Sequence, residues 1–302
     1  MLKSQYMTSC SILRDQRPEE NNRNWLNLPA ELMMSILQRV GCYDVLMNAK
    51  KVCKSWHRLC KDPCTWRVVQ IRGCVIQQNL KDKIFVCSKI GEGDVLQKMA
   101  MHVVDLSCGQ LLDLSFHMFG SDHLLQYIYQ RSSHLRRLRL ESCYLNNTSS
   151  SNPVRHISSK GLIQMLENLP LLEELEFVSA WISGEVIEVA GRCCPHLKSF
   201  TFNQGSVIFP LFGESDVQAV AIAEHMPGLR HLQLSNNLMT ITGLRAILKN
   251  CHNLESLNLR QCYNLYRALD QEPELETILR KQIKHVRFPN SSTKDYESGN
   301  YV

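Results

Sequence analysis

The feature that most constrains the fold is a short apolar pattern, Leu-x-x-Leu-x-Leu with aromatic variants, that recurs six times. The copies begin at Leu111, Leu135, Leu172, Leu197, Leu229 and Leu254. Their first-to-first spacings are 24, 37, 25, 32 and 25 residues, so three equal a single period and two carry insertions. A period of this length indicates stacked units, each of which buries its apolar side against its neighbours.

The stretches between the copies begin with a polar residue and continue with apolar residues at i and i+3 or i+4, which is typical of capped helices. The polar starts are Ser121-Asp122, Ser158-Ser159, Ser183, Ser215-Asp216 and Thr240 or Thr242. Each unit is therefore expected to be a strand followed by a helix. Two further helices are expected, from Asp94 to about Leu106 and from Pro273 to Lys284. The second is acidic at its start and basic at its end, and it would cap the stack.

Residues 25–71 have a different character. Leu28-Pro29-Ala30-Glu31 predicts the start of a helix that Gly41 ends, and a second helix is expected roughly from Tyr43 to Leu59. These short helices carry more apolar surface than so small a unit can bury alone, which predicts a binding partner. Residues 24–71 also hold seven Lys or Arg against three Asp or Glu, and this balance favours an acidic protein partner.

This segment resembles the F-box, through Leu28-Pro29-x-Glu31, Ile36-Leu37, Val52-Cys53-Lys54-Ser55-Trp56 and a final Trp66. Met33-Met34 and Met47 stand where Leu, Ile or Val are more usual, but these exchanges preserve volume. The resemblance implies docking onto a Skp-type adaptor, an acidic protein, of a cullin-based ubiquitin ligase. The apolar contacts that it implies are Leu28, Pro29, Leu32, Ile36, Leu37, Val52, Trp56 and Leu59.

One repeat, Cys251-x-x-Leu254-x-x-Leu257-x-Leu259-x-x-Cys262, resembles the cysteine-containing leucine-rich repeat that follows F-boxes. The order of the segments, an F-box followed by repeats, resembles the F-box/LRR-repeat proteins. The amino-acid sequences of several stretches resemble the short plant members of that family. The resemblance implies an α/β fold, in which a helical F-box precedes a curved solenoid with parallel strands on its concave face and helices on its convex face. The expected division is a disordered leader (1–23), the F-box (24–71), a linker leading into the solenoid (72–110), about six repeats (111–265), and a cap helix with a flexible tail (266–302).

Residues that alternate with the ladder leucines would point to solvent from the concave face. The expected substrate contacts are Asp113, His117, Arg137, Arg139, Glu174, Glu176, Thr201, Asn203, His231, Gln233, Asn258 and Arg260. Arg137 would neighbour Glu174, and Arg139 would neighbour Glu176, on strands about 4.8 Å apart, so these pairs either satisfy each other or contact substrate. The mixed polar face favours a protein or peptide ligand over nucleic acid. The apolar insertion at 203–214 is either a recognition loop or local core, whereas 144–160 is a polar loop.

No enzyme signature stands out. Cys53, His57, Cys60 and Cys64 have zinc-like spacing, but the first three lie on a helix that the F-box resemblance explains, so we expect packing and neither a metal nor another cofactor. No apolar run approaches 18 residues, which predicts no membrane span. The first 23 residues lack a signal-peptide stretch, and the chain has thirteen Cys, so a reducing compartment, cytoplasm or nucleus, is expected.

The resulting hypothesis is a non-catalytic substrate-recognition subunit of an SCF-type ubiquitin ligase. The F-box would bind the Skp-type adaptor, and through it the cullin and RING subunits, while the repeats would hold a target protein of unknown identity. Two alternatives stay open: a binding scaffold outside a ligase, and an enzyme or metal protein built on the Cys/His cluster.

Overall fold

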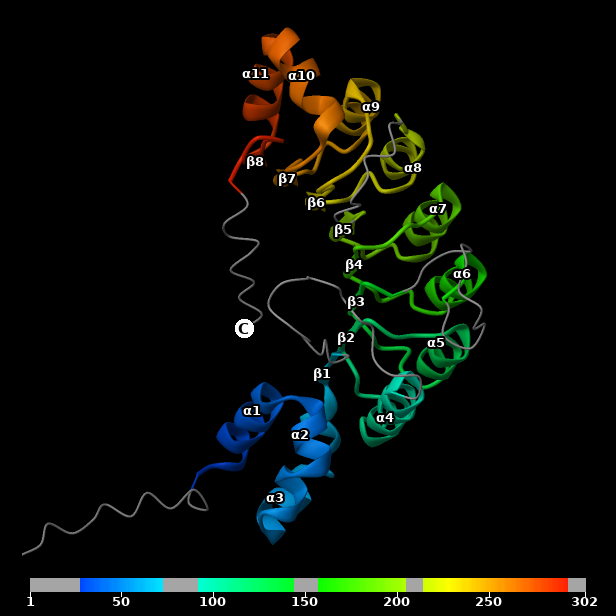
Figure 1. Cartoon of the computed structure of the whole chain (residues 1–302), viewed down its shortest axis with the longest axis vertical. Coiled ribbons are helices and arrows are strands. Elements are labelled where there is room, and N and C mark those ends of the chain that lie inside the picture. The colour runs from blue at the N-terminus through cyan, green and yellow to red at the C-terminus, as the bar shows by residue number, and fades with distance from the viewer. Residues whose placement is uncertain (1–27, 73–91, 144–156, 205–213, 293–302) are drawn as a thin grey trace, which may run out of the picture.

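The computed structural model describes residues 28–72, 92–143, 157–204 and 214–292. The helices between residues 30 and 59 lie at one end of a curved stack in which the strands are on one side and the remaining α-helices on the other (Figure 1). The strands form a single parallel sheet of eight, and their order in the sheet is their order in the chain. The α/β fold expected from the repeats is confirmed.

The strands are short, and their apolar residues stand opposite each other from one repeat to the next. Leu114 lies opposite Leu138, and Leu138 lies opposite Leu175. The strands are β1 (Val68–Arg72), β2 (Asp113–His117), β3 (Arg137–Glu141), β4 (Glu174–Val178), β5 (Ser199–Asn203), β6 (His231–Gln233), β7 (Ser256–Asn258) and β8 (His285–Arg287). The six expected strands are β2 to β7, and the sheet has one more strand at each end.

A helix follows each of the first seven strands on the convex side. These helices are α4 (Glu92–Leu106), α5 (Asp122–Tyr129), α6 (Ser159–Glu167), α7 (Gly184–Cys193), α8 (Val217–His225), α9 (Ile241–Asn250) and α10 (Tyr263–Gln271). Three expected caps form: the hydroxyl oxygens of Ser121, Ser158 and Thr240 accept hydrogen bonds from backbone N–H groups in the first turns of α5, α6 and α9. Ser183 and Asp216 stand at the starts of α7 and α8 but make no side-chain cap hydrogen bond, so the signals predicted the helix starts better than the caps.

The core lies between the sheet and the helices. Phe116, Phe177, Phe200 and Phe202 are among its largest fully buried side chains, and each burial contributes about 1.5–3 kcal/mol. Buried cysteines satisfy backbone carbonyls at the turns, as the repeat predicts. The Cys262 thiol, for example, donates to the carbonyl oxygen of Leu234 at 2.8 Å. Burial raises the pKa of Cys262 to about 12, so this thiol stays protonated and acts as a packing residue.

The first correction concerns the expected helix from Tyr43 to Leu59, which is three separate pieces. They are α2 (Cys42–Met47), a short 3-10 helix (Ala49–Lys51) and α3 (Lys54–Leu59). The chain is extended at Cys53, with φ −159° and ψ 171°, and the Cys53 sulfur accepts a hydrogen bond from the backbone N–H of Trp56 at 3.4 Å. Cys53 therefore starts a new helix because its side chain acts as the cap, although its spacing fits a continuous one.

The second correction concerns the carboxyl-terminal end of the stack. The expected cap helix is present as α11 (Pro273–Gln282), but the chain then returns to the sheet as β8. Val286 lies opposite Leu257 of β7, so β8 adds one more strand, and one more apolar position, to the end of the repeat sheet. The leader, most of the 144–160 and 203–214 insertions, and the last ten residues of the tail lie outside the described residues.

Candidate functional site

Helix α1 (Ala30–Val40) carries two apolar stripes on different sides. Met33 and Leu37 are 3% and 0% exposed and belong to the core. Leu32 and Val40 are 54% and 45% exposed, and half-buried Ile36 lies between them at the same four-residue spacing. Leu37 was expected to contact the adaptor, and this expectation is wrong, because Leu37 stabilises the F-box from within.

Helix α2 and the turn before α3 add three more exposed apolar side chains. Tyr43 and Met47 are 56% and 40% exposed, again four residues apart, and Val52 is 63% exposed. Five of the twelve large apolar side chains that are exposed in the described residues therefore lie between positions 32 and 52. We call Leu32, Val40, Tyr43, Met47 and Val52 the exposed F-box residues.

The sequence prediction named two of these five, Leu32 and Val52. It missed Val40, Tyr43 and Met47, although the i, i+4 spacing of Tyr43 and Met47 is a signal that could have found them. Of the other expected contacts, Pro29 is exposed, whereas Leu28, Trp56 and Leu59 are half-buried against the core.

Several basic residues lie close in sequence to the exposed F-box residues. Arg39, Lys51, Lys54, Arg58 and Lys61 are all exposed. The carboxylates of the same helices are fewer, since Glu31 and Asp44 are the acidic residues of α1 and α2 and α3 has none. The surface thus combines apolar contacts with positive charge, which suits an acidic partner with an apolar groove.

The F-box is joined directly to the sheet. Trp66 is 2% exposed, and its indole N–H donates to the carbonyl oxygen of Cys60 at 2.9 Å. Immediately after it, the carbonyl oxygen of Arg67 accepts from the N–H groups of Leu112 and Asp113, which start β2. Buried Ile71 then continues the apolar ladder. Trp66 and β1 therefore connect the F-box to the solenoid, and the two parts share one core.

The Cys/His cluster inside the F-box is dispersed. Cys53 caps α3, and a ring nitrogen of His57 lies 3.1 Å from the carbonyl oxygen of Lys50. Cys60 is buried in the core. The Cys64 thiol lies in a separate 3-10 helix, near Gln110. In the ranges that the structure describes, no group of three or more His, Cys, Asp or Glu side chains is placed to hold a metal ion.

The strand face of β2–β4 is held together by ion pairs. The expected registers are confirmed, since Arg137 lies opposite Glu174 and Arg139 opposite Glu176. Arg139 does pair with Glu176 and also with Glu141 at 3.1 Å, whereas Arg137 pairs with Asp113 of β2 at 2.8 Å. Burial raises the pKa of Glu176 by more than Arg139 lowers it, and the hydrogen bond to Asp113 raises the pKa of Arg137. Four of the charged groups expected to contact substrate here, Asp113, Arg137, Arg139 and Glu176, thus contact other charged groups of the sheet, and Glu174 is half-buried beside them.

Three of the expected substrate contacts are not solvent-exposed. Thr201 is 9%, Asn203 6% and Arg260 5% exposed. Thr201 is short and lies between the longer Glu176 and Gln233 on the neighbouring strands. Arg260 donates to the side-chain oxygen of Asn258 and to the carbonyl oxygen of Ser292, which draws it into the fold.

The remaining expected contacts keep some access to solvent: His231 is exposed, and His117, Gln233 and Asn258 are half-buried. The His117 ring nitrogen Nδ1 is itself buried and has no hydrogen-bond partner. The strand face as a whole is thus polar and partly accessible, as the repeat predicts.

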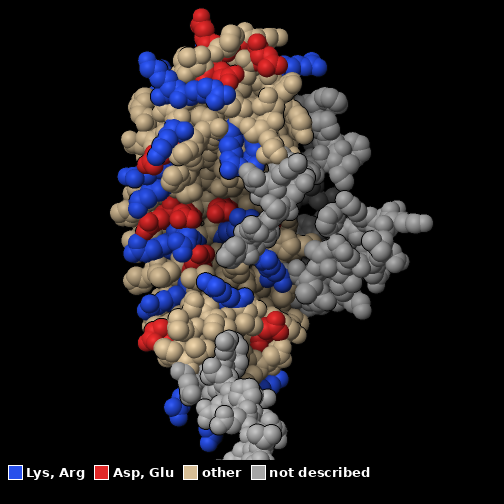
Figure 2. Space-filling view, turned by 90° about the vertical axis from the view of Figure 1, so that its left-hand side faces the viewer, with Lys and Arg blue, Asp and Glu red and all other residues tan. Residues whose placement is uncertain are grey.

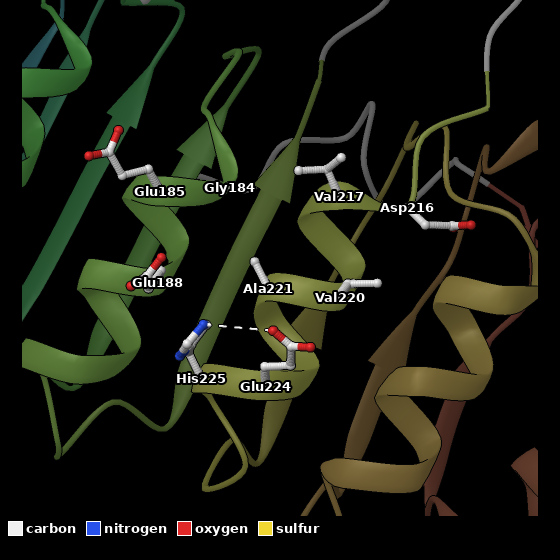
Figure 3. A pocket seen from close by; sticks show the side chains of 9 residues that line it. All are labelled: Gly184, Glu185, Glu188, Asp216, Val217, Val220, Ala221, Glu224 and His225. Atoms are coloured by element: carbon white, nitrogen blue, oxygen red, sulfur yellow. Dashed lines mark ion pairs between the residues drawn. The ribbon is translucent and has the colours of Figure 1, made fainter.

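A shallow groove on the convex side lies between α7 and α8 (Figure 3). Glu185 and Glu188 extend from α7 on one side, and Glu224 and His225 from α8 on the other, with 3.9 Å between the His225 ring and the Glu224 carboxylate. A Cβ on Gly184 would lie 2.9 Å from Val217, so this glycine permits the close packing of the two helices. The groove is open, and its lining residues are carboxylates, one histidine and small or apolar residues.

None of the helices in the described ranges combines the length and apolar character needed to cross a membrane.

Comparison with known proteins finds one match to the F-box alone and others to nearly the whole chain. The family model for the F-box domain matches residues 25–68. F-box protein SKIP19 of Arabidopsis thaliana is 40% identical over 277 residues, which cover 91% of this chain and 80% of that protein. Putative F-box/LRR-repeat protein 22 of Arabidopsis thaliana is 39% identical over 294 residues, which cover 97% of this chain and 84% of that protein.

A third relative is longer than this chain. Putative F-box/LRR-repeat protein 23 of Arabidopsis thaliana is 39% identical over 282 residues, and the match spans 93% of this chain but only 56% of that protein. The fold and the two surfaces define a two-part binding protein, an F-box joined to a leucine-rich-repeat solenoid. The chain belongs to the F-box/LRR-repeat proteins.

Proposed function

We propose that this protein is the substrate-recognition subunit of an SCF-type ubiquitin ligase and that its F-box binds the Skp-type adaptor. The observation that carries the proposal is the exposure of five large apolar side chains on the F-box, each between 40% and 63% exposed. Exposed apolar groups in such number favour a protein partner, since burying them against one is stabilising by about 25 cal/mol per Å². The exposed cations beside them add attraction for an acidic adaptor.

The solenoid then holds the target protein, and the protein itself performs no covalent step. Its contribution to ubiquitination is positional, because holding a target near the ubiquitin-charged enzyme raises the effective concentration of the target's lysines. The shared core at Trp66 and β1 supports this role, since a loose joint would spread the target over many positions. The thirteen Cys favour a reducing compartment, so the proposed site of action is the cytoplasm or nucleus.

The competing proposal is a binding scaffold that uses the same F-box surface outside a ligase. The scaffold proposal gives this surface another partner, or the adaptor without cullin, whereas only the ligase proposal predicts that cullin and RING subunits join the complex and that a bound target is ubiquitinated.

The first experiment compares two double variants for co-purification with a Skp-type adaptor. Leu32→Asp/Val52→Asp places two charges among the exposed F-box residues, whose side chains are 54% and 63% exposed, so the fold should tolerate them. Val95→Asp/Val217→Asp is the matched control on α4 and α8, with side chains 56% and 61% exposed. We expect the first variant to lose the adaptor and the control to retain it.

Equal retention by both variants would overturn the assignment of the surface. With the adaptor bound, the second step adds cullin and RING subunits. Assembly of the full complex supports the ligase proposal, whereas an adaptor complex that excludes cullin supports the scaffold.

A further inference from the structure

The strand face divides into two halves of opposite charge. To compare their charges, we count the alternate residues of each strand that point away from the core and the residue just before each strand. Because β6 and β7 are short, we also count the next alternate residue after each of them, at positions 235 and 260. For β2–β4 these positions hold three arginines and five carboxylates, namely Arg136, Arg137, Arg139, Asp113, Glu141, Glu173, Glu174 and Glu176. For β5–β8 they hold five cations and one carboxylate, namely Lys198, Arg230, Arg260, Lys284, Arg287 and Glu255. The first half thus carries a formal −2 and the second a formal +4.

Ion pairs occur in both halves. In the β2–β4 half, Arg137 pairs with Asp113, and Arg139 pairs with Glu141 and Glu176. In the β5–β8 half, two of the cations at the starts of strands have a carboxylate partner: Lys198 pairs with Glu173 at 3.1 Å and Arg230 with Glu255 at 3.4 Å. Lys284, the residue just before β8, and Arg287, its last residue, are both exposed, as is His285 between them. Figure 2 shows red and blue side chains side by side across the middle of this face, and blue predominating directly above that band.

The cations of β6–β8 are close enough to act together. Adjacent parallel strands lie about 4.8 Å apart, so β6 and β8 are separated by roughly 10 Å. His231 and His285 stand in register with Ser256 on the strand between them, and Gln233 and Arg287 stand in register with Asn258. About three residues of an extended peptide span that distance, so one short segment can meet cations from two strands.

We propose that the β6–β8 strand face and its leading edge, with Arg230, Lys284 and Arg287 as anchors, bind an acidic segment of the target protein. This rests on the proposed function, since it names the chemistry of the segment that the solenoid would hold. Carboxylates are attracted by the +4 half and repelled by the −2 half, so the charge pattern also sets where along the stack the segment lies. The neutral amides of Gln233 and Asn258 between the cations supply hydrogen bonds without opposing the charge.

The test uses the full chain and a fluorescein-labelled oligo-glutamate peptide, with binding followed by fluorescence anisotropy at low salt. Lys284→Glu/Arg287→Glu reverses two anchors and should weaken binding by about tenfold or more. Lys160→Glu/Lys249→Glu makes the same change in net charge at exposed positions of α6 and α9 on the convex side, and it should change binding less than about twofold. An oligo-lysine peptide should not bind this face.

Three results would overturn the proposal: no binding of the oligo-glutamate peptide, equal loss in both double variants, or preference for a single-stranded oligonucleotide of matched charge. A phosphoserine peptide that binds while oligo-glutamate does not would overturn it too, because the proposed ligand is a carboxylate segment. Adaptor co-purification is measured on the same preparations. If the unsubstituted protein binds the adaptor but not the oligo-glutamate peptide, only the acidic-segment proposal is refuted, whereas an unsubstituted protein that does not bind the adaptor refutes the proposed function.

Discussion

The F-box and the β2–β4 strand face use exposed side chains in opposite ways. The F-box leaves Leu32, Tyr43 and Val52 more than half exposed. The strand face of β2–β4 is rich in charge, yet Arg137 and Arg139 are already paired with carboxylates of the same sheet. A surface whose groups are satisfied internally stabilises the fold, and a surface whose groups are left exposed is the better candidate for binding. Exposure together with pairing therefore separates residues that sequence reasoning had placed in one class of site residues.

The largest expected effect sharpens this comparison within the F-box. Leu37→Ala removes a fully buried side chain and should lower the free energy of unfolding by about 2–5 kcal/mol, because it leaves a cavity in the core. Val52→Ala, at a side chain 63% exposed, should change it by about 0.5 kcal/mol or less. Urea unfolding followed by circular dichroism measures both. Equal destabilisation by the two variants would mean that the division into inner and outer stripes is wrong.

The next effect concerns packing inside the stack. A Cβ on Gly243 would lie 2.4 Å from the carboxylate of Asp216, which accepts hydrogen bonds from the backbone N–H and the hydroxyl of Thr240. Gly243→Ala should therefore lower the free energy of unfolding by about 1–3 kcal/mol, through displacement of that carboxylate.

Gly228→Ala is the matched control, since a Cβ there meets no atom within 4 Å. It should be neutral or slightly stabilising in the same urea experiment. If Gly243→Ala were as harmless as this control, the close contact between α8 and α9 would not exist in solution.

The smallest effect tests an ion pair at the edge of the strand face. Hydrogen bonds from Lys198 and Arg136 hold the pKa of Glu173 below its ordinary value. A carboxyl with a lowered folded-state pKa contributes stability above its unfolded pKa, and this contribution is lost as the pH falls through the folded value. Glu173→Gln should therefore remove a small part of the stability measured near neutral pH and flatten its decline in the acid range. The partners are largely exposed, so the effect is small.

Urea midpoints measured between about pH 3 and 7 record this difference. Glu167→Gln, at an exposed position of α6, is the control that should leave the profile unchanged. An unchanged profile for Glu173→Gln as well would show that the ion pair contributes nothing measurable.

The sequence predicted the repeated ladder well, because Leu138 or Phe200 in a fixed period has few alternatives to a stacked strand. The prediction failed where the side chain of one residue changes the local structure that the periodic spacing indicates. Cys53 fits the spacing of a long helix, but its own sulfur caps a new one. β8 has only three residues and a single ladder position, Val286, so no repeat was visible there.

The site was less predictable than the fold, since spacing places residues on an element without saying which side is covered. Leu32 and Leu37 are both apolar residues of the F-box pattern, and only packing against the rest of the chain makes one outward and the other buried. The register of Arg137 opposite Glu174 was predictable from the repeat, whereas the choice of Asp113 as its partner depends on side-chain conformation.

The central claim is that one rigid chain carries two separate binding surfaces, and a crossed affinity measurement tests it most directly. The unsubstituted protein, Leu32→Asp/Val52→Asp and Lys284→Glu/Arg287→Glu are each titrated with a Skp-type adaptor and with the oligo-glutamate peptide. We expect the first variant to lose the adaptor and keep the peptide, and the second to lose the peptide and keep the adaptor. If either variant lost both ligands while remaining folded by circular dichroism, the two surfaces would not be separate and the claim would fail.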